Sequence, residues 1–299
     1  MYTRPISVAP VIFNQYGKLL FIYVLYVTAV WVVYDPLGVE EIDIKMSIAT
    51  ILGFTVSLLL GFRTASAYDR WWEARKVWGG IVNDSRTLVR QGIGFAGKGK
   101  AIKEVQELAY YMIAWCYALK NGLRKLDPIE ETGRYLSEDE KSTIAPLNNK
   151  HNEILKLMEL KLHEMREKEL IDGFQHVAMD NSLKQLCDHM GKCERIKNTI
   201  FPQRYREYTH KGILIFLVML PYGMLFSTGP FSIAICFITS FFFLMIESIA
   251  FSLQDPFSNI GSDTPMSALS RTIEINILEM MGEAHELETL TPDKDGILM

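Results

Sequence analysis

The chain lacks the short motifs that mark most enzyme classes. It has no glycine-rich phosphate-binding loop and no nucleophile elbow, and no second histidine follows His163-Glu164 to complete a zinc protease motif. Strand-like alternation of polar and apolar residues is nearly absent, which predicts an all-α protein. With no catalytic cluster and no cofactor motif in the sequence, we expect neither an enzyme nor a bound cofactor.

Cysteine is scarce, and there is no excess of basic charge. The four cysteines are expected to be reduced thiols in a cytosol-facing or membrane protein. Cys187, His189 and Cys193 form a C-x-H-x₃-C cluster, but the spacing matches no common zinc site, so we expect no metal there. The basic residues are balanced by acids and the pI is about 5.9, which argues against a nucleic-acid partner.

Charge is missing from four long runs in a chain of ordinary overall composition, 49% hydrophobic and 22% charged. The runs are residues 19–34, 46–62, 212–235 and 236–246. Crossing a bilayer takes about 20 apolar helical residues. The first two runs reach that length with their flanks, and residues 212–253 suffice for two helices joined at Ser227-Thr228-Gly229-Pro230. We therefore predict four transmembrane helices; buried helices of a large soluble protein are the alternative.

The distribution of basic residues predicts the orientation. Nearly all Lys and Arg lie between Arg63 and Lys211 or before the first run, whereas the loop 35–45 is acidic. The positive-inside rule then puts both termini in the cytosol. No cleavage site follows the first run, so it is expected to remain as an anchor. The predicted segments are a cytosolic N-terminus (1–18), two membrane helices (19–63), a cytosolic helical region (64–209), two more membrane helices (210–254) and a cytosolic C-terminal helix and tail (255–299).

Helical periodicity continues outside the apolar runs. One helix face carries Ile154, Leu157, Met158, Leu162 and Met165, and a second carries Leu269, Ile273, Ile277 and Met280. Asp263-Thr264-Pro265 is typical of a helix start, with Asp or Thr as the cap and Pro in the first turn. We expect a loop around 127–150 and a frayed acidic tail from Glu283.

The second apolar run carries two adjacent stripes. Phe54, Leu58 and Phe62 recur every four residues, and Gly53, Ser57 and Gly61 form a stripe of small residues beside them. Small residues at this spacing let helices approach closely in lipid. In a ring of identical helices, the large side chains would point to the axis and the small ones to the next helix. The alternative is that the large side chains face lipid, and the spacing alone does not decide between them.

One segment resembles a known family. It comprises Gly61-Phe62-Arg63, Ala67-Tyr68-Asp69-Arg70-Trp71-Trp72-Glu73-Ala74-Arg75, Trp78-Gly79 and Asn83-Asp84-Ser85-Arg86, and it is similar to the signature of prokaryotic bestrophins. Residues 195–202 and 255–257 resemble two further bestrophin segments, in the same order. The resemblance implies a homopentameric ion channel in a prokaryotic inner membrane, contacting lipid and small inorganic ions. Each subunit would have four membrane helices, a helical cytosolic region and one shared axial pore.

The resemblance also implies roles for individual residues. Phe54, Leu58 and Phe62 would form an apolar pore neck that acts as a hydrophobic gate, and Phe201 a second constriction at the cytosolic exit. We assign Arg70, Trp71, Trp72, Glu73 and Arg75 to structural work at the inner boundary and the subunit interface. Two departures stand out: Ile200 replaces a frequent proline, and few acids surround Asp255-Pro256-Phe257. Calcium takes six to eight oxygen ligands, so we do not expect the calcium site of eukaryotic members.

Ion selectivity and the role of Glu247 are left with alternatives. The positive edges of the Phe54, Phe62 and Phe201 rings favour anions such as chloride, whereas acids in the loop 35–45 would concentrate cations at the mouth. A cation-conducting homologue and a non-conducting scaffold or sensor are the other hypotheses. Glu247 is an acid within an apolar run and thus a functional candidate, or else it pairs with a basic neighbour such as Arg63 or Lys211.

Overall fold

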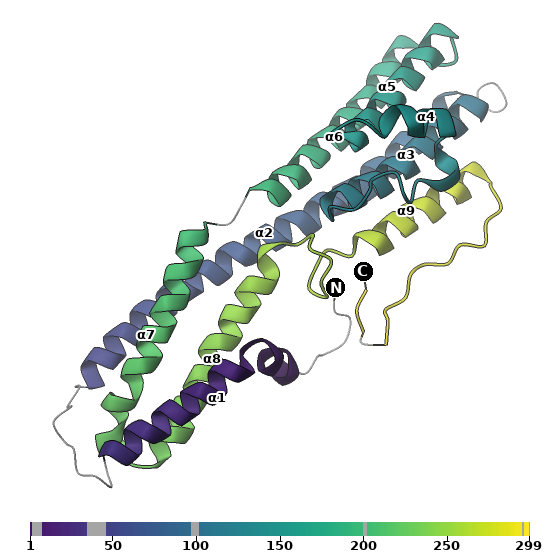
Figure 1. The fold of residues 1–299 in the computed structure, drawn as a ribbon. Helices are drawn as coiled ribbons and strands as arrows, with labels where there is room; N and C mark the ends of the chain where they lie inside the picture. Colours follow the sequence, from purple (N-terminus) through teal and green to yellow (C-terminus); the bar gives the residue numbers. More distant parts are fainter. Residues whose placement is uncertain (2–7, 35–45, 97–101, 200–201, 295, 299) are drawn as a thin grey trace. The chain divides into compact units, whose positions relative to one another are not determined.

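A computed structural model describes residues 1, 8–34, 46–96, 102–199, 202–294 and 296–298. Helices dominate the described part of the chain, which confirms the predicted all-α class (Figure 1). In chain order they are α1 (Val8–Tyr34), α2 (Met46–Phe95), α3 (Ile102–Leu123), the 3₁₀ helix η1 (Gly133–Tyr135), α4 (Glu138–Ile144), α5 (Lys150–Glu167), α6 (Gly173–Asn198), α7 (Gln203–Thr228), α8 (Phe231–Gln254) and α9 (Met266–Met281).

The chain divides into two compact units. The apolar unit comprises Pro5–Arg70 and Ile200–Gln254, and the polar unit comprises Met1–Arg4, Trp71–Thr199 and Asp255–Met299. Helix α2 contributes its first half to the apolar unit and its second half to the polar unit. The sequence predicted a change of character near residue 63, but no helix end occurs there.

In the apolar unit, α1, α7, α8 and the first half of α2 form a helical bundle (Figure 1). Three helices in the described part of the chain are long and apolar enough to cross a membrane, and they contain Pro10–Val33, part of Met46–Phe95, and Phe231–Gln254. Helix α7, which contains Pro221, is not among them. The predicted turn at 227–230 is shorter than expected, because α7 continues to Thr228 and only Gly229 and Pro230 form the turn.

Helices α2 and α7 approach each other closely because glycines lie between them. The ring of Phe216 on α7 covers Gly53 on α2 so tightly that a Cβ at Gly53 would lie 2.8 Å from it. Farther along, the Tyr205 hydroxyl donates a hydrogen bond of 2.8 Å to the carbonyl oxygen of Leu59. This contact orients one face of α2 toward α7 and leaves the other face outward.

The polar unit has its own hydrophobic core around Trp78 of α2 and Trp115 of α3, both fully buried. The stripe predicted on α5 is confirmed, since four of its five members are buried and Leu157 packs against the core. The predicted inner face of α9 is confirmed in the same way, with Ile273 and Ile277 fully buried.

Three local predictions in the polar unit need correction in detail. Helix α9 starts at Met266 with Pro265 at the cap position and without a side-chain cap, because Asp263 accepts a bond from the Asn259 amide instead. The region 127–150 contains η1 and α4 rather than only a loop, and α4 has a capping box between Ser137 and Glu140. The tail is held at its first residue, since Glu283 accepts hydrogen bonds from Gln106 and Tyr110.

Candidate functional site

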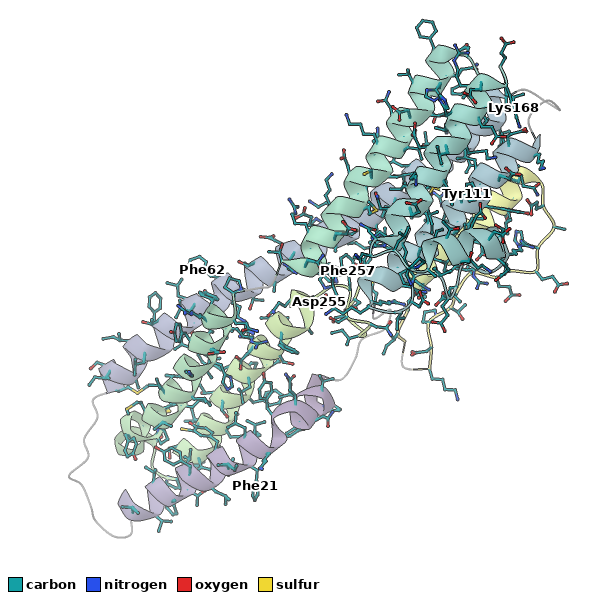
Figure 2. The ribbon with its side chains drawn as sticks, turned by 45° about the horizontal axis from the view of Figure 1, so that its top comes forward. Phe21, Phe62, Tyr111, Lys168, Asp255 and Phe257 are labelled. Atoms are coloured by element: carbon teal, nitrogen blue, oxygen red, sulfur yellow. The ribbon has the colours of Figure 1, made fainter. Side chains whose placement is uncertain are left out.

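The bulky stripe of α2 lies on the outside of the apolar unit. Phe54, Leu58 and Phe62 are 71%, 50% and 60% exposed. Figure 2 shows the Phe62 side chain projecting from α2 on the side away from α1. The opposite face of the same helix is buried and consists of Ala49, Val56, Leu60, Arg63 and Ala67. The structure therefore presents three large apolar side chains to whatever surrounds a single copy.

The small-residue stripe divides into two parts. Gly53 packs against Phe216 within the chain, a contact that could not be predicted from the sequence. Ser57 and Gly61 are exposed, and no atom lies within 4 Å of the position that a Cβ on Gly61 would take. This end of the stripe leaves room for a second helix beside α2.

A charged cluster is buried directly behind the bulky stripe. Arg63 Nη1 lies 3.1 Å from Glu247 Oε1, and the two residues are 2% and 3% exposed. The other carboxylate oxygen is 2.9 Å from His210 Nδ1 and accepts a hydrogen bond of 3.4 Å from the Tyr16 hydroxyl. A buried carboxylate is tolerated when its oxygens are paired and hydrogen-bonded in this way.

The cluster settles one of the alternatives raised by the sequence. Glu247 pairs with Arg63, which confirms that pairing over the one with Lys211. The participation of His210 and Tyr16 was missed, because no local pattern links α7 and α1 to an acid on α8. Four helices thus converge on one carboxylate.

The Arg/Trp-rich segment of α2 makes structural contacts within the polar unit. Trp71 Nε1 donates a hydrogen bond of 2.8 Å to the carbonyl oxygen of Ser262, and its ring stacks on Trp72 at a centroid distance of 6.1 Å. Glu73 pairs with Arg195 of α6 at 2.7 Å. Arg70 and Arg75 are half-buried on the same helix. These contacts attach α2 to the segment after α8 and to α6.

The segment after α8 does not fit a calcium ion. The Lys197 ammonium lies 2.8 Å from Asp255 Oδ2, and the other oxygen of Asp255 accepts the Phe257 amide at 3.2 Å. Figure 2 labels Asp255 and Phe257 at this point. Asp263 Oδ2 is bonded to the Asn259 amide at 2.5 Å. Because a lysine already supplies the positive charge and few oxygens remain, the residues do not provide the six to eight ligands that calcium takes.

The cysteine–histidine cluster of α6 is dispersed in the structure. His189 Nε2 lies 2.9 Å from Asp84 of α2, while Cys193 is buried and Cys187 is exposed. Within the described ranges, no group of three or more His, Cys, Asp or Glu residues is arranged to hold a metal ion. Three features named from the sequence lie outside the described residues: Phe201, Ile200 and the loop 35–45.

Comparison with known proteins agrees with this architecture. The model of the bacterial and fungal bestrophin family matches residues 6–279. A voltage-dependent anion channel-forming protein of Mesorhizobium japonicum is 30% identical over 93% of this chain and 87% of its own length. One from Escherichia coli K12 is 28% identical over 85% of this chain and 83% of its own length. The crystal structure of a bacterial bestrophin homologue from Klebsiella pneumoniae has a TM-score of 0.82 and 29% identity, with 89% of this chain and 98% of that chain covered. A match that covers nearly the whole chain in sequence and in structure leaves one conclusion: the chain belongs to the bestrophin family.

Proposed function

We propose that this protein is an ion channel, not an enzyme, and that it conducts small monovalent anions such as chloride. The names of its relatives from M. japonicum and E. coli, both voltage-dependent anion channel-forming proteins, support this function. The similarity extends over more than four fifths of each chain, so it includes the membrane helices as well as the polar unit. The pore is formed by five copies around a common axis, with α2 of each copy as its lining.

The observation behind this assignment is the outward stripe of Phe54, Leu58 and Phe62 on a helix whose opposite face is fully packed. A ring of five α2 helices would turn the stripe toward the axis. Gly61, which has open space beside it, would let the neighbouring helix approach. Lipid is the other possible environment for the stripe. Gly53 is explained by Phe216 of the same chain, so the exposed Ser57 and Gly61 are the small residues that favour a neighbouring helix over lipid.

The stripe determines how such a pore works. Stacked apolar rings make a narrow, dry constriction that closes by dewetting and contains no charge to trap an ion. Ring edges at Phe54 and Phe62 carry partial positive charge and stabilise a passing anion. Phe201 forms the second constriction at the cytosolic exit. Discrimination between ions is modest, because no charged side chain lies on the stripe.

The chain crosses the prokaryotic inner membrane four times, through α1, α2, α7 and α8, and keeps both termini in the cytosol. The boundaries are those predicted from the sequence, with membrane segments at 19–63 and 210–254. Exposed apolar side chains such as Phe21 on α1 (Figure 2) support contact with lipid. Phe242 on α8 is exposed in the same way. Arg70, Trp71, Trp72, Glu73 and Arg75 stabilise the inner boundary and the subunit interface.

The reversal potential of the purified protein in a planar bilayer under a KCl gradient tests the function. We expect it to shift toward the chloride equilibrium potential, and the mass of the detergent complex, corrected for bound detergent, to equal five chains. A shift toward the potassium potential would retain the channel and refute anion selectivity. A pentamer that passes no current at any voltage, or a monomer, would refute the proposal.

A further inference from the structure

Arg63 is the first charged residue of α2. No charge occurs between Met46 and Phe62. The phenyl ring of Phe62 is exposed, whereas the guanidinium of the next residue, Arg63, is buried. The charge therefore lies one layer behind the last ring of the bulky stripe, inside the bundle of the same chain. Its partner, Glu247, is equally buried.

The two members of this pair differ in the number of polar partners that contact them. Glu247 has three partners, Arg63, His210 and Tyr16, so both of its oxygens are engaged. Arg63 contacts the carboxylate through Nη1, while its buried Nε has no hydrogen-bond partner among the residues that the structure describes. The pair is close to electrically neutral only as long as both charges are present.

Buried charges act over a longer range than surface charges. Coulomb energies rise as the effective dielectric constant falls, and salt screens buried groups much less than exposed ones. An ion in a dry apolar neck has few water molecules around it and responds to the nearest fixed charges in the protein. Along α2, the fixed charge nearest to the stripe is Arg63.

We propose that the buried Arg63–Glu247 pair is a specificity-determining element of the channel: the cancellation of its two charges behind the Phe62 ring keeps the discrimination between anions and cations modest. The inference rests on the proposed function, because it requires the stripe to face the pore. In the native protein the carboxylate cancels the guanidinium, which keeps discrimination modest. His210 and Tyr16 are positioning residues that hold the carboxylate in place.

Charge-neutralising variants of both partners test this inference. Glu247→Gln leaves Arg63 unopposed and is expected to raise the chloride-to-potassium permeability ratio about three- to tenfold. Arg63→Gln leaves the carboxylate unopposed and should lower the ratio by a similar factor. The double variant removes both charges and should return close to the native ratio. Opposite shifts that cancel cannot come from a purely structural role, which would move all three variants in one direction or stop assembly.

A second pair of variants avoids the buried positions. The His210 side chain is 39% exposed, so it tolerates substitution better than Arg63 or Glu247. His210→Lys places a permanent ammonium charge at the same carboxylate and should raise the ratio. His210→Gln adds no charge and is the matched control. If the Arg63 and Glu247 variants do not assemble, these two variants test the inference: a higher ratio for His210→Lys than for His210→Gln supports it, and equal ratios refute it.

The outcomes separate this inference from the proposed function. If the native protein conducts and all charge variants that assemble keep its reversal potential, the charge-setting role is refuted and the channel stands. If Glu247→Gln and Arg63→Gln shift the ratio in the same direction, the pair is structural. A native protein that does not conduct refutes the channel itself.

Discussion

The imidazole of His189 on α6 lies directly over the backbone of Gly80 on α2, and its Nε2 is 2.9 Å from Asp84 Oδ2. A Cβ on Gly80 would lie 2.5 Å from both Cε1 and Nε2 of the ring. No other residue type fits at this position without moving the imidazole. The glycine is therefore required by the approach of two helices in the polar unit, not by a turn.

Gly80→Ala should destabilise the polar unit. The added methyl group displaces the imidazole and breaks its contact with Asp84, and overpacking of this kind costs about 1–3 kcal/mol. Gly79→Ala is the matched control, because no atom lies within 4 Å of its Cβ position and alanine favours a helix by about 0.5–1 kcal/mol. Thermal denaturation of the full chain in detergent measures both. Equal melting temperatures for the two variants would contradict the prediction.

Leu58→Ala should widen the proposed neck and raise the single-channel conductance without preventing assembly. Leucine to alanine removes three carbons from each of the five side chains in one ring, which lowers the barrier to hydration of the constriction. Leu25→Ala on α1 is the control, since Leu25 is exposed to a similar degree, 54% against 50%, on a helix outside the proposed lining. An unchanged conductance for a well-folded Leu58→Ala channel would mean that the stripe does not face the axis.

Gly61→Leu should weaken assembly but not the folding of the single chain. Space is open around Gly61 within one copy, so a side chain there meets an obstacle only if another subunit is present. Gly53→Ala should show the reverse pattern, because its Cβ would lie 2.8 Å from Phe216 of the same chain. Detergent mass and melting temperature, measured on both variants, distinguish the two effects. A stable Gly61→Leu pentamer would remove Gly61 from the subunit interface.

Asp263 should make the polar unit more stable in mild acid. Burial raises the pKa of this carboxyl to about 6, above its usual value near 4, so the folded chain holds a proton that the unfolded chain releases between these two values. The contribution to stability is complete below about pH 4 and is lost as the pH rises through about 6, with a size on the order of 2 kcal/mol. Asp263→Asn should abolish this part of the pH dependence. Melting temperatures of both proteins at pH 4.5 and 7.5 provide the test, and parallel curves would contradict it.

Periodicity predicted those parts of the fold that repeat along one helix. The stripe on α5 and the inner face of α9 were predicted correctly, because the apolar residues of each face recur every three or four positions within one helix. The helix-cap prediction failed at Asp263, because a competing local hydrogen bond engages its carboxylate. The carboxylate bonds the Asn259 amide of its own loop and leaves the start of α9 uncapped.

Contacts between distant residues could not be predicted in full. Glu247 and Arg63 are 184 positions apart, and both Arg63 and Lys211 were candidate partners for the acid before the structure was known. His210 and Tyr16 were not predicted as partners, since a single histidine or tyrosine at the edge of an apolar run has no distinctive pattern. The Gly53–Phe216 contact was missed for a related reason, because a glycine does not reveal which neighbour occupies the space beside it.

The ion pair between Lys197 and Asp255 has a consequence for how the chain is built. The polypeptide leaves the polar unit after Lys197 and re-enters it at Asp255, and the two side chains are 2.8 Å apart. The segment between them, which includes α7 and α8, therefore starts and ends at the same place in the polar unit. In the proposed membrane topology, such a segment enters the lipid as a single helical hairpin, since neither of its ends has to be carried across. For the same reason, a short linker replacing residues 200–254 would rejoin the polar unit without stretching it.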